Sequence, residues 1–117
     1  MLEPINFFKE QRQSLRVSLY SPLRFQIKSS RKFGSTVSRD ISLGGIRFLT
    51  DNFVPVGTSM ILEVNLGDTP NIVNAIADVV WTQKLPHTDR YQMGLRFSEI
   101  GEPYHQEISD YINSRRG

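Results

Sequence analysis

The strongest pattern in the chain is Thr58-Ser59-Met60-Ile61-Leu62-Glu63-Val64-Asn65-Leu66. Every even-numbered residue of this stretch from position 60 onward is a large apolar one, and Gly67-Asp68 follows it directly. Successive side chains of a strand point to opposite faces, so this alternation predicts a strand with one buried face. The glycine and aspartate predict that the strand ends in a turn.

Similar runs of β-branched and aromatic residues recur at fairly even spacing between turn residues. They predict further strands at residues 22–28, 34–39, 45–50, 73–83 and 91–97. A helical period then places Ile100, Tyr104, Ile108, Tyr111 and Ile112 on one face. Evenly spaced short strands are typical of an all-β sandwich or barrel, and we expect the amphipathic helix, at about residues 101–115, to cover the barrel mouth.

Length and composition indicate a single domain. The chain has 117 residues and shows neither an internal repeat nor a linker. Without cysteine it has no disulfide, thiolate metal site or cysteine nucleophile. It also has no apolar stretch near the roughly 18 residues that cross a bilayer, and its first residues do not resemble a secretory leader. We therefore expect a cytoplasmic protein without membrane insertion.

Charge is unevenly distributed along the chain. Residues 1–48 contain nine lysines or arginines and three acids, a balance of +6, whereas residues 49–117 contain five and nine, a balance of −4. The sum is the net charge of +2. An excess of cations in the first part favours an anionic ligand there, although a solvated basic face would give the same balance.

Two short segments carry the candidate site. The first is Arg12-Gln13-Ser14-Leu15-Arg16, and the second is Asp40-Ile41-Ser42-Leu43-Gly44-Gly45. Guanidiniums bind phosphate and stack on bases, a carboxylate accepts hydrogen bonds from a guanine edge, and glycine leaves room for close approach. Taken separately, each segment also has a structural interpretation: two surface arginines, and an Asx or Ser turn that enters a Gly-Gly hairpin.

Together the two segments resemble the paired signature of the PilZ family, Arg-x-x-x-Arg followed by Asp/Asn-x-Ser-x-x-Gly. Val79-Val80-Trp81 and Gly94-Leu95-Arg96-Phe97 are similar to the late strands of that family. The resemblance covers about residues 9–112. It implies a six-stranded antiparallel β-barrel with one C-terminal helix, in agreement with the strand count, and the bacterial second messenger cyclic di-GMP as the usual ligand.

The resemblance also implies roles for individual residues. Arg12 and Arg16 would bind phosphate and stack on guanine, and the contact would be completed by Asp40, Ser42 and Gly45. Two neighbours are accessory candidates. Gln11 stands where the resemblance suggests an influence on whether one or two ligand molecules bind, and Arg39 should point to the opposite face of the strand from Asp40.

Enzyme chemistry finds little support in the sequence. His87 and His105 lack a spacing suited to zinc, and nothing indicates a nucleophile beside a base. We expect no catalytic residue, metal or cofactor. Trp81, Phe25, Phe48 and Phe97 are expected in the core rather than at the ligand.

The sequence thus predicts a non-catalytic cyclic di-GMP receptor. Residues 1–17 would form an arm that carries the arginine motif, and residues 18–117 the barrel with its helix. Ligand binding would order residues 9–17 against the turn at 40–45, and an unidentified downstream protein would bind the new surface. Two alternatives remain: a PilZ-like scaffold of pilus or motility machinery that binds no nucleotide, and a basic barrel that binds single-stranded nucleic acid.

Overall fold

The computed structural model describes residues 15–67 and 71–116. Within these residues there are seven strands and one helix. They are β1 (Val17–Ser18), β2 (Pro22–Ile27), β3 (Phe33–Ile41), β4 (Gly45–Thr50), β5 (Ser59–Asn65), β6 (Ile72–Lys84), β7 (Tyr91–Ile100) and α2 (Glu102–Arg116). The six strands and the helix that the sequence predicts are confirmed. β1 was not predicted, because two residues are too few to show an alternation.

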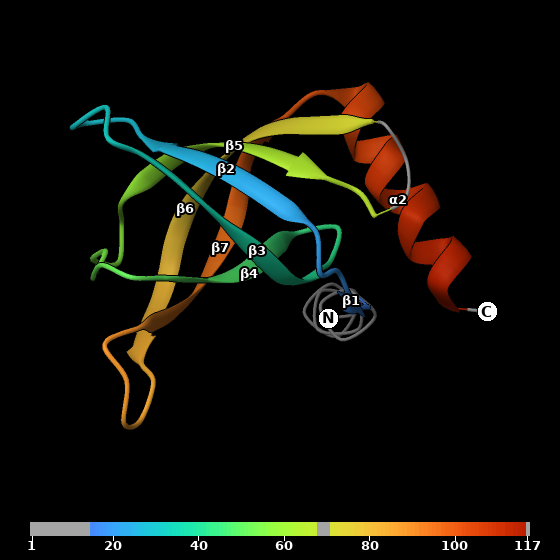
Figure 1. Ribbon diagram of the computed structural model, residues 1–117. Helices are drawn as coiled ribbons and strands as arrows, with labels where there is room; N and C mark the ends of the chain where they lie inside the picture. The colour runs from blue at the N-terminus through green and yellow to red at the C-terminus, as the bar shows by residue number, and fades with distance from the viewer. Residues whose placement is uncertain (1–14, 68–70, 117) are drawn as a thin grey trace, which may run out of the picture.

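The strands form one antiparallel sheet in the order β1-β3-β2-β5-β6-β7-β4. An additional pairing of β3 with β4 joins the two sides of this sheet, so six strands close into a barrel (Figure 1). β1 and β2 lie along the same edge of β3, since Ser18 pairs with Asp40 and Pro22 pairs with Val37. The chain therefore enters the barrel alongside the end of β3 that carries Asp40.

The core follows from the alternation in the sequence. In β5, Met60, Leu62 and Val64 are fully buried, whereas Ile61 and Glu63 between them are exposed. Phe48 of β4 is also fully buried. Burying a large apolar side chain stabilises the fold by roughly 1.5–3 kcal/mol, so the alternating positions determine which face of each strand turns inward.

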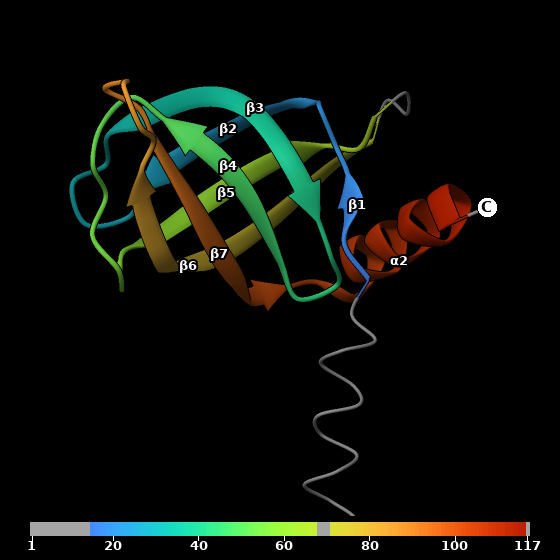
Figure 2. The same cartoon turned by 90° about the horizontal axis from the view of Figure 1, so that it is seen from below.

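α2 lies across one end of the barrel, close to β1 (Figures 1 and 2). Ile108, Tyr111 and Ile112 are buried, and the Tyr111 hydroxyl donates a hydrogen bond to the Ser18 carbonyl oxygen over 3.2 Å. The predicted apolar face of the helix therefore does cover a barrel end. This helix is too short and too polar to cross a membrane, and no other helix occurs in the two described ranges.

The prediction that Trp81 lies in the core is wrong. Its side chain is among the exposed large apolar ones, with 38% of the residue accessible. Phe25 and Phe97 are partly buried against the core, and Phe25 stacks on Phe48 with 5.8 Å between ring centroids. Trp81 is exposed because β6 contains a bulge between Val79 and Trp81, which alters the alternation of side chains.

Candidate functional site

Asp40 occupies the centre of the candidate site because of the way three strands meet. On one side of β3 it pairs with Ser18 of β1, and on the other side with Arg47 of β4. Arg47 lies between the buried residues Ile46 and Phe48, so it faces outward, and its partner Asp40 faces outward with it. A bulge in β3 between Ser38 and Asp40 produces this register.

Two arginines hold the Asp40 carboxylate. Arg16 Nη1 lies 2.6 Å from Oδ1, while Arg47 donates from Nε and Nη2 to Oδ2 over 2.8 Å and 2.5 Å. Arg47 Nη1 also donates to Gln92 Oε1 over 2.7 Å. Only 13% of the Asp40 side chain is accessible, against 46% for Arg16. The carboxylate is therefore nearly buried, and its two cations provide the charge compensation that burial requires.

The geometry of Arg16 is a consequence of β1. Arg16 stands two residues before Ser18, the direct neighbour of Asp40, so it lies diagonally across the strand pair from the carboxylate. Two guanidiniums against one carboxylate leave an excess positive charge on this surface. Arginine has five N–H donors, and the contact of Arg16 with Asp40 uses one of them, so the ion pair itself leaves donors on this guanidinium for an anion.

Ser42 shapes the turn between β3 and β4. Its backbone N–H donates to the Gly45 carbonyl oxygen over 2.9 Å, and its hydroxyl oxygen accepts from the Gly44 N–H over 3.2 Å. Ser42 is buried, whereas Leu43 and Gly44 at the tip of the turn are exposed. The hydroxyl thus stabilises a tight turn directly after Asp40.

The two glycines of this turn differ in their surroundings. A Cβ added to Gly45 would lie 2.1 Å from the Leu95 carbonyl oxygen, so the backbones of β4 and β7 approach too closely for any side chain. A Cβ on Gly44 would have nothing within 4 Å. Gly45 is therefore required for strand packing whether or not it also contacts a ligand, and Gly44 keeps the outer side of the turn open.

Three other predicted site residues are Arg39, Arg12 and Gln11. Arg39 is exposed, and it lies at the bulge between Ser38 and Asp40, which interrupts the alternation from which the opposite face was predicted for it. Arg12 and Gln11 lie outside the described residues. Among the described residues, the structure thus brings together Arg16, Asp40 and the Ser42–Gly45 turn.

Sequence reasoning missed Arg47, Gln92 and Trp81. Trp81 pairs with Gly94, Gly94 pairs with Arg47, and Arg47 pairs with Asp40, so these residues form one row across four strands. A Cβ on Gly94 would lie 2.2 Å from Trp81 Nε1, so the indole lies across this glycine on the outer face. Arg47, between two apolar residues, could have been predicted to face outward, but its partner depends on the bulged register.

These groups suit one kind of ligand. Guanidiniums bind phosphate and stack on planar rings, an indole offers an aromatic face, and a carboxylate accepts N–H donors. The row therefore favours an anionic, heteroaromatic molecule. This row lies on the outer surface of the barrel.

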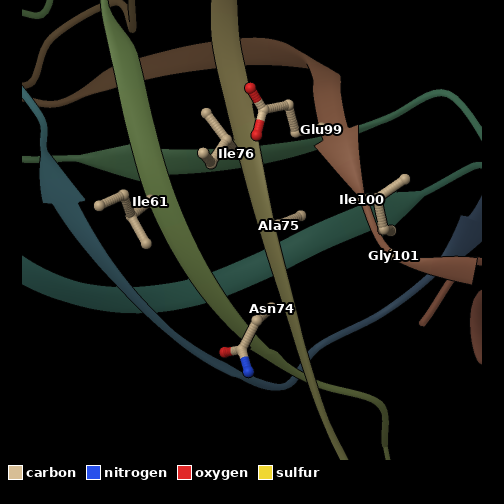
Figure 3. Close-up of a pocket in the computed structure, with 7 residues that line it drawn as sticks. All are labelled: Ile61, Asn74, Ala75, Ile76, Glu99, Ile100 and Gly101. Atoms are coloured by element: carbon tan, nitrogen blue, oxygen red, sulfur yellow. The ribbon is translucent and has the colours of Figure 1, made fainter. Parts of the chain in front are cut away.

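A separate hollow of about 410 Å³ lies on β5, β6 and β7. Figure 3 shows Glu99 beside Ile76 at one end of this hollow and Asn74 at the other. That hollow is lined by aliphatic side chains, one amide and one acid, and no cation is among its lining residues.

A family model for the PilZ domain matches residues 10–114. The chain belongs to the PilZ family. A search of curated proteins found no match. Among solved structures, this PilZ domain is similar to the Bacillus subtilis inhibitor of motility MotI/DgrA, with 24% identity and a TM-score of 0.76, over 90% of this chain and 51% of that one.

Two structures of YcgR from Escherichia coli are also similar. The complex of YcgR with cyclic di-GMP has 18% identity and a TM-score of 0.74, over 91% of this chain and 46% of that one. The separate PilZ domain of YcgR with cyclic di-GMP has 17% identity and a TM-score of 0.67, over 89% and 90%. This PilZ domain therefore spans about half the length of MotI/DgrA and of the longer YcgR chain. At these identities the likeness shows the fold.

The contrast between the two glycines of the PilZ turn can be tested by stability measurements. We expect Gly45→Ala to lower the free energy of unfolding by about 2 kcal/mol or more, because the methyl group would meet a backbone oxygen that cannot rotate away. Gly44→Ala is the matched control and should change it by less than about 0.5 kcal/mol. Urea denaturation measures both values, and equal losses would contradict the close approach of β4 and β7.

The two arginines should couple to Asp40 with different strengths. Double-mutant cycles with Asp40→Asn should give about 1–3 kcal/mol for Arg47→Met, which removes two charged hydrogen bonds at a nearly buried carboxylate. For Arg16→Met we expect less than about 1 kcal/mol, since Arg16 is half exposed and donates one hydrogen bond to Asp40. A larger coupling for Arg16 than for Arg47 would argue against this assignment.

Proposed function

We propose that this PilZ domain is a non-catalytic receptor for cyclic di-GMP. The observation that carries the proposal is the arrangement around Asp40, where a nearly buried carboxylate, two arginines and the Ser42 turn lie on one outward surface. The exposed Trp81 lies in the same row of residues. Membership of the PilZ family and the YcgR structures with cyclic di-GMP support the choice of ligand.

The ligand's chemistry matches these groups one by one. Its two phosphates need cations, which Arg12 and Arg16 would supply, and Arg16 gives Asp40 only one of its five N–H donors. A carboxylate has about four lone-pair sites and the two arginines use three of them, so Asp40 can accept one hydrogen bond from a guanine edge while both arginines hold it. Arg47 is thus proposed to orient Asp40, and Ser42 to fix the turn beside it.

We further propose that binding orders the segment before β1. Arg16 forms an ion pair with Asp40 before any ligand is bound. Residues 9–15 directly precede it in the chain, so on binding they would fold against a ligand on the same surface. Ordering would create a new surface at the end of the barrel where α2 and β1 lie, which a downstream protein could recognise. Residues 1–17 would thus form an arm whose last two residues, Arg16 and Val17, are held against β3 before the ligand binds.

The site assignment is tested by titration with cyclic di-GMP. Arg16→Ala should weaken binding by about 2–5 kcal/mol, roughly 30-fold or more, because a phosphate would lose its partner. We expect a similar loss for Arg12→Ala. Arg24→Ala is the matched control, since it removes an exposed cation of β2 that pairs with Glu63 away from this surface, and it should bind as the parent does.

Isothermal calorimetry with cyclic di-GMP, linear pGpG and GTP measures these affinities. Binding of the cyclic compound by the parent and the control, but not by the two arginine variants, supports the proposal. Absence of binding by the parent would favour the scaffold alternative. Tighter binding of long single-stranded nucleic acid with a steep salt dependence would favour the nucleic-acid alternative.

Hydrogen exchange tests the ordering step separately. Amides of residues 9–17 should exchange more slowly once cyclic di-GMP is bound, because they would become hydrogen-bonded or excluded from water. Amides of β5 serve as an internal control, since this strand pairs on both sides and is separated by β2 from the strand that carries Asp40. Unchanged exchange in the arm at saturating ligand would rule out the switch, even with the binding site intact.

A further inference from the structure

A second surface lies where β3 and β4 separate. The ladder between these strands begins at Ile41 and ends at Ser38, opposite Phe48, so the first five residues of β3 pair with β2 alone. Figure 1 shows the two strands diverging away from the end with α2. The separation leaves a hollow of about 350 Å³, which we name the β3–β4 mouth, lined by residues of β2, β3, β4, the following loop and Arg90.

Aromatic side chains line and border the mouth. Phe25 and Val54 contribute to its walls, and Phe33 and Phe53 stand at its rim with 73% and 59% of each residue accessible. Val56 in the same loop as Phe53 is 62% exposed. Apolar side chains gathered around a concave surface are a common mark of an interaction site, because water contact with them is unfavourable.

Positively charged side chains lie in and next to the mouth: Lys32 lines it, and Lys28 and Arg31 belong to the same hairpin as Lys32. Lys28, Arg31 and Lys32 are exposed in the hairpin that joins β2 to β3, and no ion pair within residues 15–67 and 71–116 involves any of them. Asp51, the acid that lines the mouth, is paired with Arg90 over 3.2 Å. These three cations form no ion pair with the described part of the chain, so carboxylates of a partner could pair with them.

Arg31 has an unfavourable backbone conformation. Its φ is 62°, in the left-handed region that glycine adopts at no steric cost. The turn is closed by hydrogen bonds from Arg31 N–H to Ile27 O over 2.7 Å and from Ile27 N–H to Lys32 O over 2.9 Å. Glycine would suit this geometry better, so the guanidinium is held at the hairpin tip at the expense of local stability.

We propose that the β3–β4 mouth binds an acidic segment of a partner protein, which inserts an aromatic or aliphatic side chain flanked by carboxylates. The concave shape favours an inserted side chain over a flat membrane surface, and the cations of the hairpin set the charge of the partner. This surface is distinct from the Asp40 site. Phe33 and Asp40 are seven residues apart on one strand, roughly 23 Å, so the inference does not depend on the ligand proposed there.

The test uses amide NMR spectra of the full chain. The probe is a short peptide with a tryptophan and a leucine between two runs of glutamate, and its matched control carries lysine in place of glutamate. We expect the glutamate peptide, and not the lysine peptide, to change the amide chemical shifts of residues 33–36 and 51–54. Shifts centred on Asp40, equal effects of both peptides or no binding of the glutamate peptide would overturn the proposal.

Variants separate binding from folding. Arg31→Gly should weaken the glutamate peptide roughly 2- to 5-fold while the midpoint of thermal unfolding stays the same or rises. Phe33→Ala should weaken it about 10-fold, and Arg96→Ala, which removes an exposed cation of β7, should not. Unchanged affinity in Arg31→Gly and Phe33→Ala would also overturn the proposal. A third outcome would also overturn it: the domain binds vesicles of phosphatidylglycerol, does not bind vesicles of phosphatidylcholine, and does not bind the glutamate peptide. The mouth would then be a surface for anionic lipid.

Discussion

The candidate site depends on the charge compensation of one carboxylate. Asp40 is nearly buried on the outside of a barrel, where Arg47 holds one of its oxygens and Arg16 the other. A carboxylate in this position is stable only while it is paired. The pairing joins β3 both to β4, which carries Arg47, and to the residue directly before β1, which is Arg16. It attaches the segment that enters the barrel to the surface where we propose that ligand binds.

The same arrangement gives the two arginines different roles. Arg47 is fixed by Asp40 and Gln92 together, so it is a rigid part of the sheet. Within the described part of the chain, Arg16 makes one hydrogen bond, to Asp40, and 46% of its side chain is accessible to water. A ligand phosphate can therefore compete for Arg16 or share it at little expense to the fold. Arg47 is thus suited to orient the Asp40 carboxylate, and the more exposed Arg16 is suited to bind the phosphate of a ligand.

Much of the fold could be predicted from side-chain alternation, and less of the site. Met60, Leu62 and Val64 mark one inward face, so β5 could be located within a residue. Bulges are not visible in such a pattern. They place Arg47 opposite Asp40 and expose Trp81, so both residues were missed or misassigned. Arg16 could be named from its spacing, but its contact with Asp40 required the pairing of β1, which is too short to predict.

The divergence of β3 from β4 separates two surfaces on a small domain. Near α2 the strands are paired, and this pairing sets Asp40 against Arg47. Away from α2 they part, and the walls of the barrel become accessible beneath a cationic hairpin. Both surfaces are positively charged, yet one presents a carboxylate and an indole, and the other exposed phenylalanines. Both surfaces would therefore attract anions, and the groups beside the cations would select between anionic partners: a carboxylate and an indole on one surface, and phenylalanines on the other.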